Sequence, residues 1–218
     1  PEDAVDPRTV PQRTLRTGAA MPAIGLGTFS NDRYTPAEIA AAVTGALDAG
    51  YRLIDCAAAY GNEPEIGGAL ADALAGGIKR EEMFITSKLW NDRHAPEKAL
   101  PALEKTLSDL RLDYLDMYYI HWPFGNTHEP GAAHDDRSPS ARPYNHAAYM
   151  AVYHELEKAM ERGLIRHIAT SNMTVAKLKL VLPEVTVKPA ANQMEMHPCF
   201  SQPVFFDLKD TISNEDLL

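Results

Sequence analysis

The stretch Arg52-Leu53-Ile54-Asp55 is a short apolar run that ends in a carboxylate, and a helical pattern from about Pro64 to Ala75 follows it. This order is typical of a β-strand and its return helix in a parallel sheet. The same unit recurs along the chain. Further strands are predicted at residues 24–27, 84–88, 115–121, 165–171 and 190–193. The alternation therefore predicts an α/β fold built on a parallel sheet.

The chain has 218 residues, which suits one sizeable domain. We expect residues 1–13 to form a flexible, proline-rich lead without the features of a signal peptide, and residues 14–218 to form a single domain. Residues 14–22 look like a small hairpin. Thr35-Pro36-Ala37-Glu38 is a capping box with proline at the first helical position, so it predicts the start of a helix.

The composition of the chain excludes several classes of binding partner. The formal net charge is -9, which repels phosphate backbones, so we expect no nucleic-acid partner. No apolar run reaches the roughly 18 residues needed to span a membrane, so no membrane partner is expected. Cys56 and Cys199 form neither a disulfide framework nor a CxxC pair, which favours a reduced, cytoplasmic setting. The histidines include no HxH pair and no HExxH motif, so we predict no metal site and disfavour a metal-dependent hydrolase.

A long polar loop is predicted at residues 125–146. It contains Pro130, Pro139 and Pro143 and shows no periodicity. Long loops without structure in a compact domain are usually functional or disordered. Because this loop follows His121 at the end of a strand, we interpret it as a substrate-side loop rather than an idle insertion.

Polar residues recur at the strand ends with a regular spacing. Asp55, Lys88 and His121 follow one another at intervals of 33 residues, and Tyr60 lies five residues after Asp55. One such residue per strand, each at the carboxyl end, would converge on one mouth of a barrel. We call Asp55, Tyr60, Lys88 and His121 the tetrad.

The tetrad suits the reduction of a carbonyl group. The developing alkoxide needs a proton donor, and a free tyrosine with a pKa of about 10 is a slow acid at neutral pH. A nearby Lys88 ammonium would lower the pKa of Tyr60, Asp55 would orient the lysine, and His121 would bond the substrate oxygen. Each residue alone has an ordinary structural explanation, such as a helix cap or a packed ring, but the matched spacing favours a site.

Several motifs resemble those of the aldo-keto reductase family. Residues 50–57, with Tyr60-Gly61-Asn62-Glu63 and residues 66–67, resemble its first signature. Residues 86–90 and 119–123 resemble its lysine and histidine strands. Residues 25–29, 171–172 and 192–198 are similar to its first-, fifth- and sixth-strand motifs. The resemblance runs from about Leu15 to Leu208, and it implies a TIM (β/α)8 barrel that reduces an aldehyde or ketone to an alcohol.

The resemblance also implies roles for individual residues. The tetrad would be catalytic, with Tyr60 as proton donor. NADPH is the expected cofactor, with NADH as the alternative, and the protein is expected to act as a cytoplasmic monomer of the NADP-dependent aldehyde reductase type. The residues expected to bind the cofactor are Thr28, Phe29, Asp55, Ser171, Asn172 and Gln193. The residues expected to form the apolar wall of a pocket for a small carbonyl substrate are Phe29, Trp90, Trp122 and Phe124.

The sequence departs from the family pattern after Leu208. Residues 209–218 resemble the segment after the eighth strand of the family, although only six strands precede them. Against a usual barrel of about 250 residues, two βα units, or roughly 66 residues, would be missing. We hypothesise that they belong between Leu208 and Lys209. In the family, the residues that bind the cofactor's adenosine phosphate lie in this missing segment. The alternative therefore stays open that the protein is a catalytically silent relative that binds a cofactor or a protein.

Overall fold

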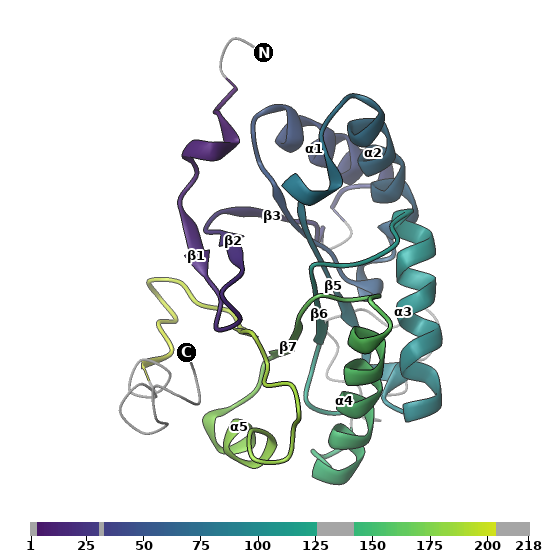
Figure 1. The fold of residues 1–218 in the computed structure, drawn as a ribbon, viewed down its shortest axis with the longest axis vertical. Coiled ribbons are helices and arrows are strands. Elements are labelled where there is room, and N and C mark those ends of the chain that lie inside the picture. Colours follow the sequence, from purple (N-terminus) through teal and green to yellow (C-terminus); the bar gives the residue numbers. More distant parts are fainter. Residues whose placement is uncertain (1–3, 31–32, 126–141, 204–218) are drawn as a thin grey trace.

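A six-stranded parallel sheet forms the centre of the chain (Figure 1). The computed structural model describes residues 4–30, 33–125 and 142–203. The sheet order follows the sequence, which is typical of a barrel wall and not of a doubly wound sheet. Its strands are β3 (Gly25–Gly27), β4 (Leu53–Asp55), β5 (Phe84–Leu89), β6 (Met117–Ile120), β7 (Ile168–Ser171) and β8 (Asn192–Gln193). All six predicted strands are confirmed, with shorter bounds for most.

The helices cover one side of this sheet, and Figure 1 shows α1 to α4 side by side along it. Their bounds are α1 (Pro36–Asp48), α2 (Glu63–Ala75), α3 (Pro96–Leu110), α4 (His146–Glu161) and α5 (Val175–Val181). Buried aliphatic and aromatic side chains from the sheet and the helices form one core between the two layers. Because the return helices α1 to α4 lie on the same side of a sheet whose order follows the sequence, the arrangement matches part of a (β/α) barrel.

The start of α1 follows the prediction from its capping box. The Thr35 hydroxyl accepts a hydrogen bond from the Glu38 N–H, and the Glu38 carboxylate accepts one from the Thr35 N–H at 2.8 Å. Two of the four N–H groups that a helix start leaves without partners are satisfied in this way.

The hairpin lies on the other side of the sheet from the helices (Figure 1). Its strands β1 (Gln12–Thr14) and β2 (Ala20–Pro22) pair antiparallel, as predicted, although β1 begins within the expected lead of residues 1–13. In that lead, residues 7–9 form a 3-10 turn, and the Val5 N–H donates to the Ala49 carbonyl. Leu15 joins Phe84 and Met117 in a second, smaller core on the inner face.

The described strands form part of a TIM-barrel-like fold, with β3 and β8 at the two edges of the sheet. The proposed segment between Leu208 and Lys209 and most of the predicted loop at 125–146 lie outside the described residues. Within the described parts of the chain, no helix combines the length and the apolar character that crossing a membrane requires.

Helices α2 and α3 approach closely at Gly67. A methyl group added there would collide with the Asp109 carbonyl oxygen and the Leu110 backbone of α3, whereas one added at Gly68 would meet no atom within 4 Å. We therefore predict that Gly67→Ala lowers the free energy of unfolding by about 1–3 kcal/mol through overpacking. Gly68→Ala, the matched control, should raise it by about 0.5–1 kcal/mol because alanine favours the helix. Urea denaturation of both variants checks this, and equal effects would contradict the close approach.

Candidate active site

The tetrad side chains meet at the carboxyl ends of three neighbouring strands. Asp55 is the last residue of β4, Lys88 lies near the end of β5, and His121 directly follows β6. Tyr60 closes a 3-10 turn, η2 (Ala58–Tyr60), just beyond β4. The carboxyl ends of neighbouring parallel strands lie side by side. Residues spaced 33 apart, one on each strand, are therefore brought into one cluster.

Lys88 is the centre of this cluster. Its side chain is 1% exposed, and its ammonium donates to Asp55 Oδ2 at 2.8 Å, to the Cys56 carbonyl at 2.8 Å and to Tyr60 Oη at 3.4 Å. Burial is the largest single influence and lowers the pKa of Lys88, but the Asp55 carboxylate and the Tyr60 hydroxyl together raise it by more, so the net pKa lies above its ordinary value. The ammonium is therefore charged at neutral pH and has a partner for each of its three protons.

Thr86 and Thr28 hold Asp55 in place. The Thr86 hydroxyl donates to Asp55 Oδ1, which leaves Oδ2 for Lys88. The Thr28 N–H and hydroxyl both donate to the Asp55 carbonyl. Thr86 was not among the predicted site residues, although the alternation of side chains along a strand puts residues 86 and 88 on the same face.

The pKa of Tyr60 differs from the sequence-based expectation. Burial raises this pKa most, the Lys88 ammonium lowers it, and the Asp55 carboxylate raises it again, so the net pKa lies above 10. The expected lowering by Lys88 is therefore present but outweighed. The physical reason is mainly the burial of the phenol, which disfavours the phenolate, and the Asp55 carboxylate adds to this effect against the Lys88 ammonium at 3.4 Å.

Aromatic rings surround the tetrad. The Phe29 ring lies 5.1 Å from that of Tyr60, and the Tyr60 and His121 rings lie 5.9 Å apart, edge to face. Trp90 packs edge-on against His121 at 5.1 Å between ring centroids. Trp122 is 37% exposed and packs on Phe124 at 5.8 Å. Of the four predicted pocket residues, Phe29 and Trp90 thus contact the tetrad rings directly.

The predicted amide and hydroxyl residues gather at the ends of β7 and β8. Ser171 and Gln193 are register partners, and the Asn172 N–H donates to the Gln193 carbonyl at 2.9 Å. Asn172 has a φ of 55°, a left-handed conformation that asparagine tolerates. Its side-chain amide donates to the His121 carbonyl at 3.0 Å and to Ser171 Oγ at 3.2 Å. Asn172 therefore links this group to the tetrad.

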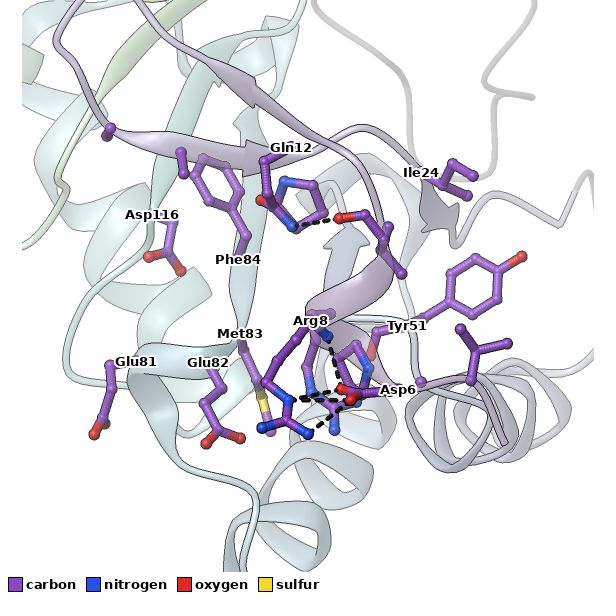
Figure 2. Close-up of a pocket in the computed structure, with 18 of the residues that line it drawn as sticks. Asp6, Arg8, Gln12, Ile24, Tyr51, Glu81, Glu82, Met83, Phe84 and Asp116 are labelled. Atoms are coloured by element: carbon purple, nitrogen blue, oxygen red, sulfur yellow. Dashed lines mark hydrogen bonds and ion pairs between the residues drawn. The ribbon is translucent and has the colours of Figure 1, made fainter. Parts of the chain in front are cut away.

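A cavity of about 790 Å³ lies at the opposite end of the sheet (Figure 2). Its wall includes Phe84, Asp116 and His167, which lie where the strands begin, and Figure 2 shows the ion pair of Asp6 and Arg8 beside it. In barrels, the face where strands begin serves stability, and the face where they end carries the chemistry. We therefore place the candidate active site at the tetrad and not in this cavity.

The fold places the chain among α/β proteins of the TIM-barrel-like class, with a polar cluster at the strand ends. In the described ranges, no three His, Cys, Asp or Glu side chains gather as metal ligands. The family model of the Aldo/keto reductase family matches residues 23–214. The chain therefore belongs to the aldo/keto reductase family, an oxidoreductase family, and the resemblance seen in the sequence is confirmed.

Individual relatives support this assignment. The chain is 47% identical over 189 residues to an aldo/keto reductase of Synechocystis sp. and 44% identical over 190 residues to aldo-keto reductase family 1 member A1 of Bos taurus. Each match covers 86% of this chain but only 56% and 57% of the relative, so the chain spans a little over half of their length.

Solved structures agree on the fold. An aldo-keto reductase of Bombyx mori in complex with NADP is similar with a TM-score of 0.82 and 32% identity, over 95% of this chain and 64% of that one. The aldose reductase of Schistosoma japonicum gives a TM-score of 0.81 and 38% identity, over 93% of this chain and 66% of that one.

The loop after Trp90 contains a histidine that makes stability depend on pH. Burial lowers the pKa of His94 from 6.5 to about 4, and within the described residues its buried Nε2 atom meets no hydrogen-bond partner. The unfolded chain therefore binds a proton more readily between pH 6.5 and 4, and this contribution to stability is lost as the pH falls through that window.

We predict that the wild-type protein loses about 2 kcal/mol more unfolding free energy than His94→Gln between pH 7 and pH 4.5. Urea denaturation of both proteins at the two pH values measures the difference. Equal losses in both would mean that His94 is not buried in its neutral form.

Proposed function

We propose that this protein reduces an aldehyde or ketone to an alcohol with NADPH, and that Tyr60 donates the proton. The observation that carries the proposal is the Lys88 ammonium, buried at the strand ends between the Asp55 carboxylate and the Tyr60 hydroxyl. Membership of the aldo/keto reductase family and the NADP complex of the Bombyx mori relative support the class of reaction. The cytoplasmic location and the monomeric state of the protein stay predictions from the sequence.

Each tetrad residue has one task in this proposal. His121, whose ring lies edge-on to Tyr60, bonds the substrate oxygen and orients the carbonyl. Tyr60 gives its hydroxyl proton to that oxygen as the C–O bond becomes single, and Lys88 stabilises the phenolate that results. Asp55 keeps Lys88 charged and directed at Tyr60. The raised pKa of Tyr60 keeps its hydroxyl protonated at neutral pH, so the acid is present in the form that the reaction consumes.

The polar side chains of Ser171, Asn172 and Gln193, at the ends of β7 and β8, fit the carboxamide of a nicotinamide. Both N–H bonds of the Asn172 side chain point to protein acceptors, and among the described residues no donor meets its Oδ1 atom. Ser171, Asn172 and Gln193 together offer acceptors and donors to a carboxamide, and Thr28 and Phe29 lie beside the tetrad at the end of β3. NADPH, when bound, would supply the hydride that adds to the carbonyl carbon.

The aromatic wall indicates the substrate class. Phe29 and Trp90 border the tetrad, and Trp122 with Phe124 extends the apolar surface from the end of β6. Such a wall suits aldehydes with apolar or aromatic bodies, because burying them releases water from both surfaces.

We predict that Tyr60→Phe lowers kcat for NADPH-dependent aldehyde reduction by about 100-fold or more, because a positioned acid contributes that much. Tyr51→Phe removes an exposed phenol that lines the cavity at the opposite end of the sheet, so it is the matched control, with unchanged kcat. A panel of aromatic and aliphatic aldehydes, followed by NADPH oxidation, measures both. Full activity in Tyr60→Phe would remove Tyr60 as the donor.

We also predict that Gln193→Ala weakens NADPH binding about 5- to 10-fold, the equivalent of roughly one hydrogen bond. Gln12→Ala, in the hairpin, is the control and should bind as the wild type does. Quenching of tryptophan fluorescence reports the binding. Tight NADPH binding by the wild type without turnover of any aldehyde would instead favour a catalytically silent binding protein.

A further inference from the structure

A buried carboxyl group lies behind the tetrad, on the helix side of the sheet. Glu63 is the first residue of α2 and is 3% exposed. The Ser87 hydroxyl of β5 donates to its Oε1 at 2.6 Å, and the Thr106 hydroxyl of α3 donates to its Oε2 at 3.1 Å. The proposed reaction uses none of these three side chains. Buried polar groups of this kind are costly unless their hydrogen bonds are complete, so the arrangement fixes local geometry.

The position of Glu63 along the chain gives this geometry a consequence. It lies three residues after Tyr60, and the intervening Gly61 turns the chain tightly with a φ of 66°. Asn62 is also buried, and its side-chain amide donates to the Thr28 carbonyl at 2.9 Å. The segment that carries Tyr60 is thus fastened to β3 through Thr28 and to β5 through Glu63.

Ser87, the residue that Glu63 holds, is the direct neighbour of Lys88. Alternation along β5 turns Ser87 toward the helices and Lys88 toward the tetrad. The Ser87–Glu63 hydrogen bond therefore ties the Tyr60 segment directly to the strand that carries its charged partner. The Lys88–Tyr60 contact, at 3.4 Å, is the longest of the three that Lys88 makes, so a small shift of the segment would break it first.

We propose that Glu63 is a positioning residue that holds the Tyr60 hydroxyl against the Lys88 ammonium by accepting the hydrogen bond of Ser87. Its relevance to carbonyl reduction rests on the proposed function, whereas the contact that it sets does not. The role needs an acceptor oxygen and no charge at residue 63. Glutamine should therefore replace Glu63, since its amide oxygen can accept from Ser87 and its amide nitrogen can donate to Thr106.

The experiment titrates the phenol at position 60 in the cofactor-free protein. Site-specific 3,5-difluorotyrosine at this position ionises at lower pH than tyrosine, and its ¹⁹F resonance reports the midpoint. Ser87→Ala and Glu63→Ala should raise this midpoint by about 1 unit, because the phenolate loses the nearby ammonium. Glu63→Gln should leave the midpoint within about 0.2 pH unit of the wild-type value.

Thr106→Val is the matched control. It removes the other hydrogen bond to the same carboxylate but leaves the one to Ser87, so it should lower the unfolding free energy without moving the midpoint. If Thr106→Val moves the midpoint as far as Ser87→Ala does, or if Ser87→Ala does not move it, the positioning role is refuted. Should Glu63→Ala fail to fold, Ser87→Ala and Glu63→Gln still decide the question.

The titration also separates this proposal from the proposed function. It needs neither turnover nor cofactor, so a protein that reduces no aldehyde can still show the predicted shifts. Conversely, an active reductase whose Tyr60 midpoint ignores Ser87→Ala would retain the proposed function and lose the positioning role of Glu63.

Discussion

The buried ammonium of Lys88 is the constraint on which the site depends. A lysine taken out of water is costly unless it is paired and fully hydrogen-bonded. Here the Asp55 carboxylate, the Cys56 carbonyl and the Tyr60 hydroxyl meet that need. The parallel pairing of β4 with β5 brings these groups together. The register of the sheet therefore keeps Lys88 charged, and the ion pair of Lys88 with Asp55 in turn favours that register.

The remaining parts of the site build outward from this ammonium. Thr86 fixes the far oxygen of Asp55, and Asn172 bonds the His121 carbonyl and so joins the end of β7 to the tetrad. On the helix side, Glu63 ties the Tyr60 segment to β5. Every one of these contacts joins residues far apart in the sequence, so it is the packing of the fold that brings the cluster together.

The sequence predicted the parts of this structure that repeat or that follow local rules. The spacing of the strands predicted that Asp55, Lys88 and His121 lie together at the carboxyl ends of neighbouring strands, and the capping box at Thr35 predicted the start of α1. It could not predict the direction in which the pKa of Tyr60 shifts, because that depends on how deeply the fold buries the phenol and on where it places two charges of opposite sign. Glu63 was also missed, since an acid at a helix start is usually exposed, and only the packing of α2 on α3 and β5 buries it.

The state of Lys88 is the most direct test of this account. Its ¹⁵Nζ and ¹Hζ resonances, assigned by their absence in Lys88→Met, distinguish an ammonium from an amine. Because its pKa lies above the ordinary value, the account predicts a charged, slowly exchanging ammonium at neutral pH, and faster exchange when Asp55→Asn removes its carboxylate partner. A neutral amine at pH 7, or a signal that Asp55→Asn leaves unchanged, would contradict it.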